Sequence, residues 1–176
     1  MKRWLTLLAL VFGLSGDAVA ADLPLNAFFG SFAGTGVARS EDSQYFGVTV
    51  RDFDVQIEKT DSGFSVTWTT VLRQGGDPAN PSVRRRSATL TFTPTGKPNV
   101  YRARESDPMS DGGYAWARLY KNTLGVYIVS IDANGVYELQ RYQRTLSGGG
   151  MDIVFTRLRD GEVQRTVKGK LAKQGK

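Results

Sequence analysis

The sequence predicts an all-β protein, an antiparallel up-and-down β-barrel of about eight to ten strands. Three observations carry the prediction: short segments of alternating apolar and polar residues, turn-forming residues between them, and no amphipathic helix of useful length beyond the N-terminus. An open sheet of this size would leave two exposed edges and one wet apolar face, which closure into a barrel avoids. A two-sheet β-sandwich is the alternative architecture.

The N-terminus is typical of an export signal. Lys2 and Arg3 precede an apolar stretch over residues 4–14, and Ala18-Val19-Ala20 supplies the small-x-small pattern that signal peptidase recognises. The stretch is shorter than the roughly 20 residues that a membrane-spanning helix needs. We therefore expect cleavage after Ala20, a single β-barrel domain over residues 21–176, and a periplasmic or secreted location.

Alternation is clearest over residues 53–58, 64–69, 88–93 and 163–171. Its phase reverses across the turn at 60–63, as a hairpin with an even-length loop requires. Val48 and Val50 are out of phase with Phe53, which predicts a β-bulge near Arg51 and Asp52. One helical turn is expected over 22–29, and further strands over 30–40, 99–104, 114–121, 124–131, 136–146 and 151–157.

Gly30-Ser31-Phe32 opens the first expected strand, where lipocalins carry Gly-x-Trp. With the meander of strands, this tripeptide resembles the calycins, the family of lipocalin and fatty-acid-binding barrels, although Phe stands in place of Trp. The resemblance implies a cavity for a small apolar or amphipathic molecule. It also implies an interior Arg and Tyr that hold a ligand carboxylate.

An outer-membrane barrel shares this alternation. Such barrels usually finish on a strand ending in Phe or Trp, whereas this sequence ends on residues 171–176, Leu-Ala-Lys-Gln-Gly-Lys. Arg157 and Arg165 interrupt apolar rows at mid-strand, and no long loops alternate with the tight turns. We therefore expect a protein that does not cross the membrane.

The chain has no Cys and no His, which excludes disulfides, thiol chemistry, zinc fingers and triads with an imidazole base. Its formal net charge is +6. Basic residues gather in two places: Arg84, Arg85 and Arg86, and Arg165, Lys168, Lys170, Lys173 and Lys176. Export argues against a nucleic-acid partner, so the basic C-terminal tail is expected either to meet an anionic envelope surface or to be a solvated face.

Candidate catalytic and metal-binding groups are few. Asp52 and Asp54 share a strand face, as the paired carboxylates of a glycoside hydrolase would, but that face continues as an ordinary solvated surface. Glu105, Asp107 and Asp111 match no known calcium-loop spacing. Gly148-Gly149-Gly150 lacks the helix and Lys of a phosphate-binding loop. No catalytic residue, metal or cofactor is predicted.

The most informative feature is a set of arginines that share a strand face with apolar residues. If residues 159–161 form a three-residue loop with a bulge, Arg157 and Arg165 become diagonal neighbours on one face, beside Phe155. The same face takes Tyr137 and Arg141, provided that the odd positions of their strand point inward. Trp68 joins this predicted ligand site as a lining aromatic residue. Buried guanidinium groups need a compensating anion, so the site predicts an anionic ligand; solvated arginines at the barrel rim are the alternative.

Three functions follow from these observations. The first is a non-enzymatic binding protein for a small amphipathic or anionic ligand, such as a fatty acid or another lipid-like molecule. The second is an envelope protein with a packed core that binds another protein, or the envelope surface, through its loops. The third is a carboxylate-dependent hydrolase. A cavity separates the first function from the second.

Overall fold

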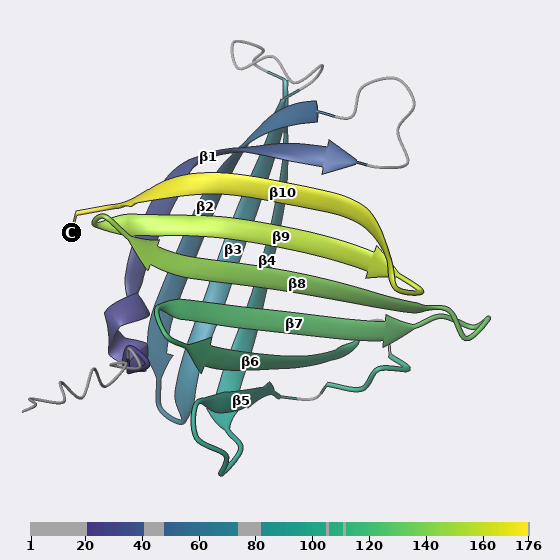
Figure 1. The fold of residues 1–176 in the computed structure, drawn as a ribbon, viewed down its shortest axis with the longest axis horizontal. Coiled ribbons are helices and arrows are strands. Elements are labelled where there is room, and N and C mark those ends of the chain that lie inside the picture. The colour runs from purple at the N-terminus through teal and green to yellow at the C-terminus, as the bar shows by residue number, and fades with distance from the viewer. Residues whose placement is uncertain (1–20, 41–47, 74–81, 105, 111, 176) are drawn as a thin grey trace, which may run out of the picture.

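The computed structural model describes residues 21–40, 48–73, 82–104, 106–110 and 112–175. The predicted export signal, residues 1–20, lies outside the described residues. The protein is a closed barrel of ten antiparallel strands, as predicted, in which each strand pairs with its neighbour in sequence and β1 pairs with β10 (Figure 1). The strands are β1 (Gly30–Ser40), β2 (Val48–Thr60), β3 (Gly63–Arg73), β4 (Val83–Pro94), β5 (Val100–Ala103), β6 (Tyr114–Tyr120), β7 (Thr123–Ile131), β8 (Tyr137–Ser147), β9 (Gly150–Arg159) and β10 (Glu162–Lys173).

Two-residue turns determine which side chains enter the barrel. The turn at residues 148–149 pairs Ser147 with Gly150, so that Leu146 and Met151 face the same side. Both turn glycines have positive φ, 52° and 83°, which suits a primed hairpin turn. Met151 is buried in the interior, so the even positions of β8 point inward. Similar two-residue turns join β2 to β3, β6 to β7 and β9 to β10.

The predicted bulge near Arg51 and Asp52 was wrong. β2 pairs with both neighbours without a register shift, so the inward phase of Phe53 extends unbroken to Arg51. Val50 therefore lies on the outer face, where it is exposed. The apolar character of Val50 reflects β-propensity on an outer surface, not burial.

The β9–β10 hairpin also differs from the prediction. Its loop has two residues, Asp160 and Gly161, both at positive φ, and the register shift occurs later, between Val163 and Arg165. Arg165 thus lies directly opposite Arg157 instead of diagonal to it. The bulge leaves Val163 exposed. Beyond the bulge, the odd-numbered positions of β10, from Arg165 onward, face the interior of the barrel.

One end of the barrel is a packed apolar core. Its largest buried side chains include Phe28, Phe32, Phe64 and Phe92; the rings of Phe64 and Phe92 stack with centroids 5.1 Å apart. The 3-10 helix η1 (Leu25–Phe28), within the predicted helical turn, contributes Phe28 to this core.

The described residues include no helix long and apolar enough to cross a membrane.

Glycines let β1 and β10 close the barrel. Gly36 and Gly169 pair across the two strands, and a Cβ on Gly36 would lie 2.4 Å from the Lys168 carbonyl oxygen and 2.7 Å from the Cα of Gly169. No side chain fits there without moving backbone.

Candidate functional site

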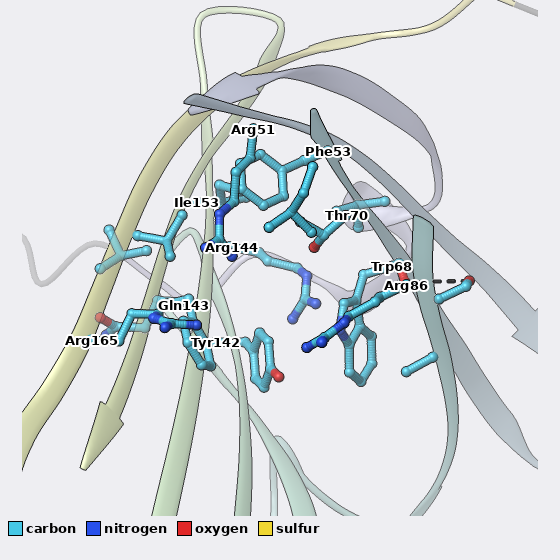
Figure 2. A pocket seen from close by; sticks show the side chains of 17 residues that line it. Arg51, Phe53, Trp68, Thr70, Arg86, Tyr142, Gln143, Arg144, Ile153 and Arg165 are labelled. Carbon is cyan, nitrogen blue, oxygen red and sulfur yellow. Dashed lines mark hydrogen bonds between the residues drawn. The ribbon is translucent and has the colours of Figure 1, made fainter. Parts of the chain in front are cut away.

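A cavity of about 230 Å³ lies inside the barrel, toward the end where β2 begins and β3 ends (Figure 2). Its wall comes from six strands, and its lining combines arginines, aromatic rings and aliphatic side chains. The lining residues are Arg51, Phe53, Val55, Trp68, Thr70, Leu72, Arg86, Ser87, Ala88, Tyr142, Gln143, Arg144, Ile153, Val154, Phe155, Arg165 and Val167. None of these described lining residues is Asp or Glu, so the formal charge of the lining is positive.

Arg144, on β8, is the most buried cation of the site. Only 2% of its surface is exposed, and its Nε and Nη1 atoms are buried without a hydrogen-bond partner among the described residues. Its guanidinium carbon lies 5.4 Å from the ring centroid of Trp68 and 5.5 Å from that of Tyr142. Burial lowers the pKa of Arg144 to about 10, so the side chain remains charged at neutral pH. The aromatic faces attract this cation without satisfying its donors.

Three further arginines face the cavity from other strands: Arg51 on β2, Arg86 on β4 and Arg165 on β10. Figure 2 shows Arg86 and Arg165 extending inward from opposite walls. Desolvation lowers the pKa of Arg51, and the charges of Arg165 and then Arg86 lower it further. Like charges therefore meet at this part of the cavity.

An aromatic belt crosses the barrel beside Arg144. The ring of Tyr142 lies 5.0 Å from that of Trp68 and 4.7 Å from that of Phe155, measured between centroids. The Tyr142 hydroxyl donates a hydrogen bond of 2.8 Å to Gln140. Burial raises the pKa of Tyr142 to about 12, which keeps the phenol protonated at neutral pH. The belt offers flat apolar surface next to a buried positive charge.

The structure brings three of the six predicted site residues to the cavity. Trp68, Phe155 and Arg165 line it. Tyr137 and Arg141 do not: they occupy odd positions of β8, whereas the even positions face inward, so the expected phase of this strand was wrong. Tyr137 is exposed. Arg141 lies opposite Tyr127 on the outer face, where its Nε has no hydrogen-bond partner among the described residues.

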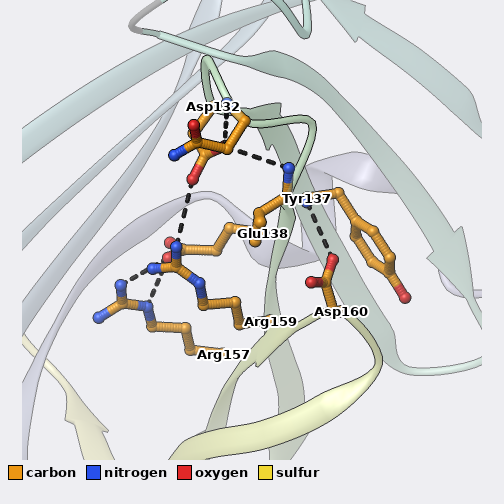
Figure 3. A network of polar contacts seen from close by, with 8 residues as sticks. Asp132, Tyr137, Glu138, Arg157, Arg159 and Asp160 are labelled. Carbon is orange, nitrogen blue, oxygen red and sulfur yellow. Dashed lines mark hydrogen bonds and ion pairs between the residues drawn. The ribbon is translucent and has the colours of Figure 1, made fainter.

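Arg157, the sixth predicted residue, points inward but is held by an ion pair. Its Nε donates to Glu138 over 2.7 Å, and its Nη2 lies against the same carboxylate oxygen (Figure 3). Glu138 faces inward because even positions of β8 do. Arg157 is not among the lining residues of the cavity. Its charge is compensated within the protein, in contrast to that of Arg144.

Sequence reasoning missed Arg51, Arg86, Tyr142 and Arg144. Arg86 continues the inward phase of Ala88, Leu90 and Phe92, so extending that alternation by one step would have placed it inside. For β8 the signal was the two-residue glycine turn, which places Leu146 on the same face as Met151. Because Met151 points inward, the alternate residues Leu146, Arg144 and Tyr142 point inward as well.

The other candidate groups lie elsewhere. Asp52 and Asp54 are on the outer face of β2, away from the cavity. Glu105 and Asp111 lie outside the described residues, and Asp107 accepts a hydrogen bond from the Met109 backbone amide within a turn. The described part of the chain contains no cluster of three or more potential metal ligands.

The basic C-terminal segment belongs to strand β10 as far as Lys173 and does not form a tail there. Lys168 and Lys170 are exposed on β10, and the Lys173 ammonium lies 5.7 Å from the ring centroid of Phe32. Lys176 lies outside the described residues.

Comparison with known proteins supports the fold. No known protein-family profile matches the chain, and no curated protein matches it in sequence. A protein of unknown function from the DUF3598 family of Nostoc punctiforme superimposes with a TM-score of 0.59 at 16% identity, over 91% of this chain and 53% of that one. This chain thus spans about half the length of that protein. An S-type phycobiliprotein lyase from Guillardia theta matches with a TM-score of 0.40 at 9% identity, over 86% of this chain and 91% of that one. The superposition with the DUF3598 protein shows a likeness of fold alone, and the antiparallel barrel predicted from the sequence is confirmed by the strand pairing.

Proposed function

We propose that this protein binds a compact amphipathic anion, with the anionic group against Arg144 and the apolar part against the belt of Trp68, Tyr142 and Phe155. The observation that carries the proposal is the buried guanidinium of Arg144, whose Nε and Nη1 have no partner among the described residues. A buried charge without a counter-charge is costly, and a bound carboxylate or phosphate would supply both the charge and the acceptors.

The size of the cavity restricts the ligand. Drug-sized ligands occupy pockets of about 300–1,000 Å³, and this cavity has about 230 Å³. We therefore expect a short acyl chain or a single aromatic ring inside the barrel, rather than a whole long-chain fatty acid. A lipid-like ligand also fits the proposal, provided that only its head group and first carbons enter the cavity.

Binding without catalysis is the simpler role for these residues. The lining combines guanidinium groups, a phenol held protonated by its raised pKa, and apolar side chains. Guanidinium groups bind anions well and exchange protons poorly at neutral pH. Recognition and retention of an anion use the guanidinium groups and require no proton transfer.

Isothermal titration calorimetry with benzoate and hexanoate tests the proposal. Arg144→Met should weaken both ligands at least about tenfold, since it removes a charge-assisted donor. Arg102→Met, on the exposed face of β5, makes the same change outside the cavity and should leave affinity unchanged. Equal affinity in wild type and Arg144→Met, or no binding of either acid to the wild type, would refute it.

We also propose that the protein meets its ligand outside the cytoplasm. Residues 2–20 have the basic start, apolar stretch and Ala-Val-Ala ending of an export signal. In a bacterial host, mass spectrometry of the exported protein should find an N-terminus at Ala21. An uncleaved protein that stays in the cytoplasm would contradict this.

A further inference from the structure

We infer that one edge of β4, over Val83–Leu90, binds an extended acidic segment of another protein, which adds to the sheet as an extra strand. The edge of a sheet presents unpaired backbone N–H and C=O groups, and an extended peptide that pairs with them gains main-chain hydrogen bonds. This interaction lies on the wall of the barrel and does not require a ligand in the cavity.

β4 has twelve residues, but its β5 side has a strand partner at only three of them. β5 pairs with Phe92–Pro94 and then ends, and the backbone amide of Arg104 donates one more hydrogen bond, of 3.3 Å, to the Thr91 carbonyl oxygen. Within the described residues, no strand pairs with this edge over Val83–Leu90. Figure 1 shows β4 extending well beyond β5. An antiparallel strand in line with β5 fits this place.

The unpaired part of β4 is open to solvent on both faces. Every residue from 83 to 89 is exposed, although alternate positions such as Ala88 face the barrel interior opposite β3. The inward-facing Phe92, which β5 flanks, is fully buried. Exposure therefore begins where β5 ends. A strand added at this edge would cover side chains on both faces.

Three consecutive arginines, residues 84–86, give this edge its charge. No residue in the described part of the chain forms a hydrogen bond or an ion pair with the side chain of Arg84 or Arg85. Arg85 points to the outer face and its two neighbours point inward, since side chains alternate along a strand. Opposite charges on directly paired residues stabilise a sheet and like charges destabilise it. The edge therefore favours a partner with acidic residues at consecutive positions over a second copy of β4.

The remaining edge residues specify the rest of the partner. Ala88 and Leu90 face inward, whereas Ser87 and Thr89 face outward. An antiparallel partner therefore alternates apolar and hydroxyl side chains before its acidic run. The peptide Val-Thr-Val-Thr-Glu-Glu-Glu has this pattern and β-branched residues that favour an extended strand.

Fluorescence anisotropy with this peptide, labelled with fluorescein, tests the inference at low ionic strength. It should bind the wild type, whereas the same peptide with Lys in place of Glu should not. The double variant Arg84→Glu/Arg85→Glu, which leaves the cavity lining unchanged, should bind the acidic peptide at least about tenfold more weakly. Lys168→Glu/Lys170→Glu makes the same change of charge on β10, which is paired on both sides, and should retain the affinity.

Backbone methylation distinguishes strand addition from attraction between charges. Two further peptides carry N-methyl groups on alternate backbone nitrogens, one on the odd and one on the even positions. One of them should lose binding, because its methyl groups face β4, and the other should retain it. Equal binding of the two methylated peptides, or equal affinity in both double variants, would overturn the inference. So would tight binding of a peptide with the sequence of residues 83–90, which would indicate a second copy, or no binding of the acidic peptide to the wild type.

Discussion

Arg144 is a cation whose neighbours are aromatic rings rather than acids. Its lowered pKa, about 10, shows that burial disfavours the charged form, and no described carboxylate offsets this cost. Under the proposed function, Arg144 serves the ligand rather than the fold. Stability and binding should therefore respond in opposite directions when Arg144 is changed.

Arg144→Met should stabilise the ligand-free protein by about 1–4 kcal/mol, because an apolar side chain of similar length replaces a desolvated charge. Burial depresses the pKa of Arg144 in the folded state, so the cost is full below pH 10 and declines as the pH rises above it. Chemical denaturation at pH 7 measures the change against Arg102→Met. A loss of stability would mean that Arg144 has a structural counter-charge.

Tyr142 has the opposite dependence on pH. Its pKa is raised to about 12, so the folded protein keeps a proton that the unfolded chain loses near pH 10. The stability that the protonated phenol provides is complete below pH 10 and is lost as the pH rises through 12. The stability difference between wild type and Tyr142→Phe should therefore shrink by at most about 1.4 kcal/mol per pH unit above pH 10. Parallel denaturation profiles from pH 9 to 11.5 would contradict the assignment.

Arg157 and Glu138 behave as a structural pair. A double-mutant cycle with Arg157→Met and Glu138→Gln should give a coupling energy of about 0.5–1.5 kcal/mol, kept modest by the 38% exposure of the Arg157 side chain. The more exposed pair of Arg159 and Asp132 provides the comparison and should couple less. Zero coupling between Arg157 and Glu138, with weaker benzoate binding in Arg157→Met, would instead move Arg157 into the ligand site.

At the scale of elements, strand register decides which side chains reach the cavity. The strand segments and most turns could be predicted from the sequence, because alternation and turn residues are local signals. The inward phase of β8 could not be predicted from its apolar residues, since Leu139 lies on the outer face while Arg144 and Tyr142 lie inside. The inner face of a strand is normally recognised by its apolar residues at alternate positions. A site that places charged residues on that face removes this signal.

Close approach of β1 and β10 depends on Gly36. In Gly36→Ala the added methyl group would meet backbone atoms of Lys168 and Gly169, so the strands must separate at the point where the barrel closes. We expect a loss of about 1–3 kcal/mol in unfolding free energy. Gly112→Ala, where a Cβ meets nothing within 4 Å, is the matched control and should be nearly neutral. Equal stability of the two variants would show that β1 and β10 adjust without cost.

At the scale of the whole molecule, closure of the barrel could be predicted from the sequence, whereas the cavity could not. A meander of this many strands buries its apolar face and its edges by closing, whatever its interior holds. The cavity depends on side chains from six strands, and its arginines come from four strands distant in sequence. Only the three-dimensional pairing brings these residues together.

The most direct measurement is a crystal structure of the protein with 4-bromobenzoate, in which anomalous scattering locates the bromine. We expect the ring beside Trp68 and Tyr142 and the carboxylate within hydrogen-bond distance of Arg144. Arg144→Met crystals treated in the same way should show no bromine in the cavity. A cavity without bromine in the wild type at saturating ligand, or a carboxylate bound away from Arg144, would contradict the central claim.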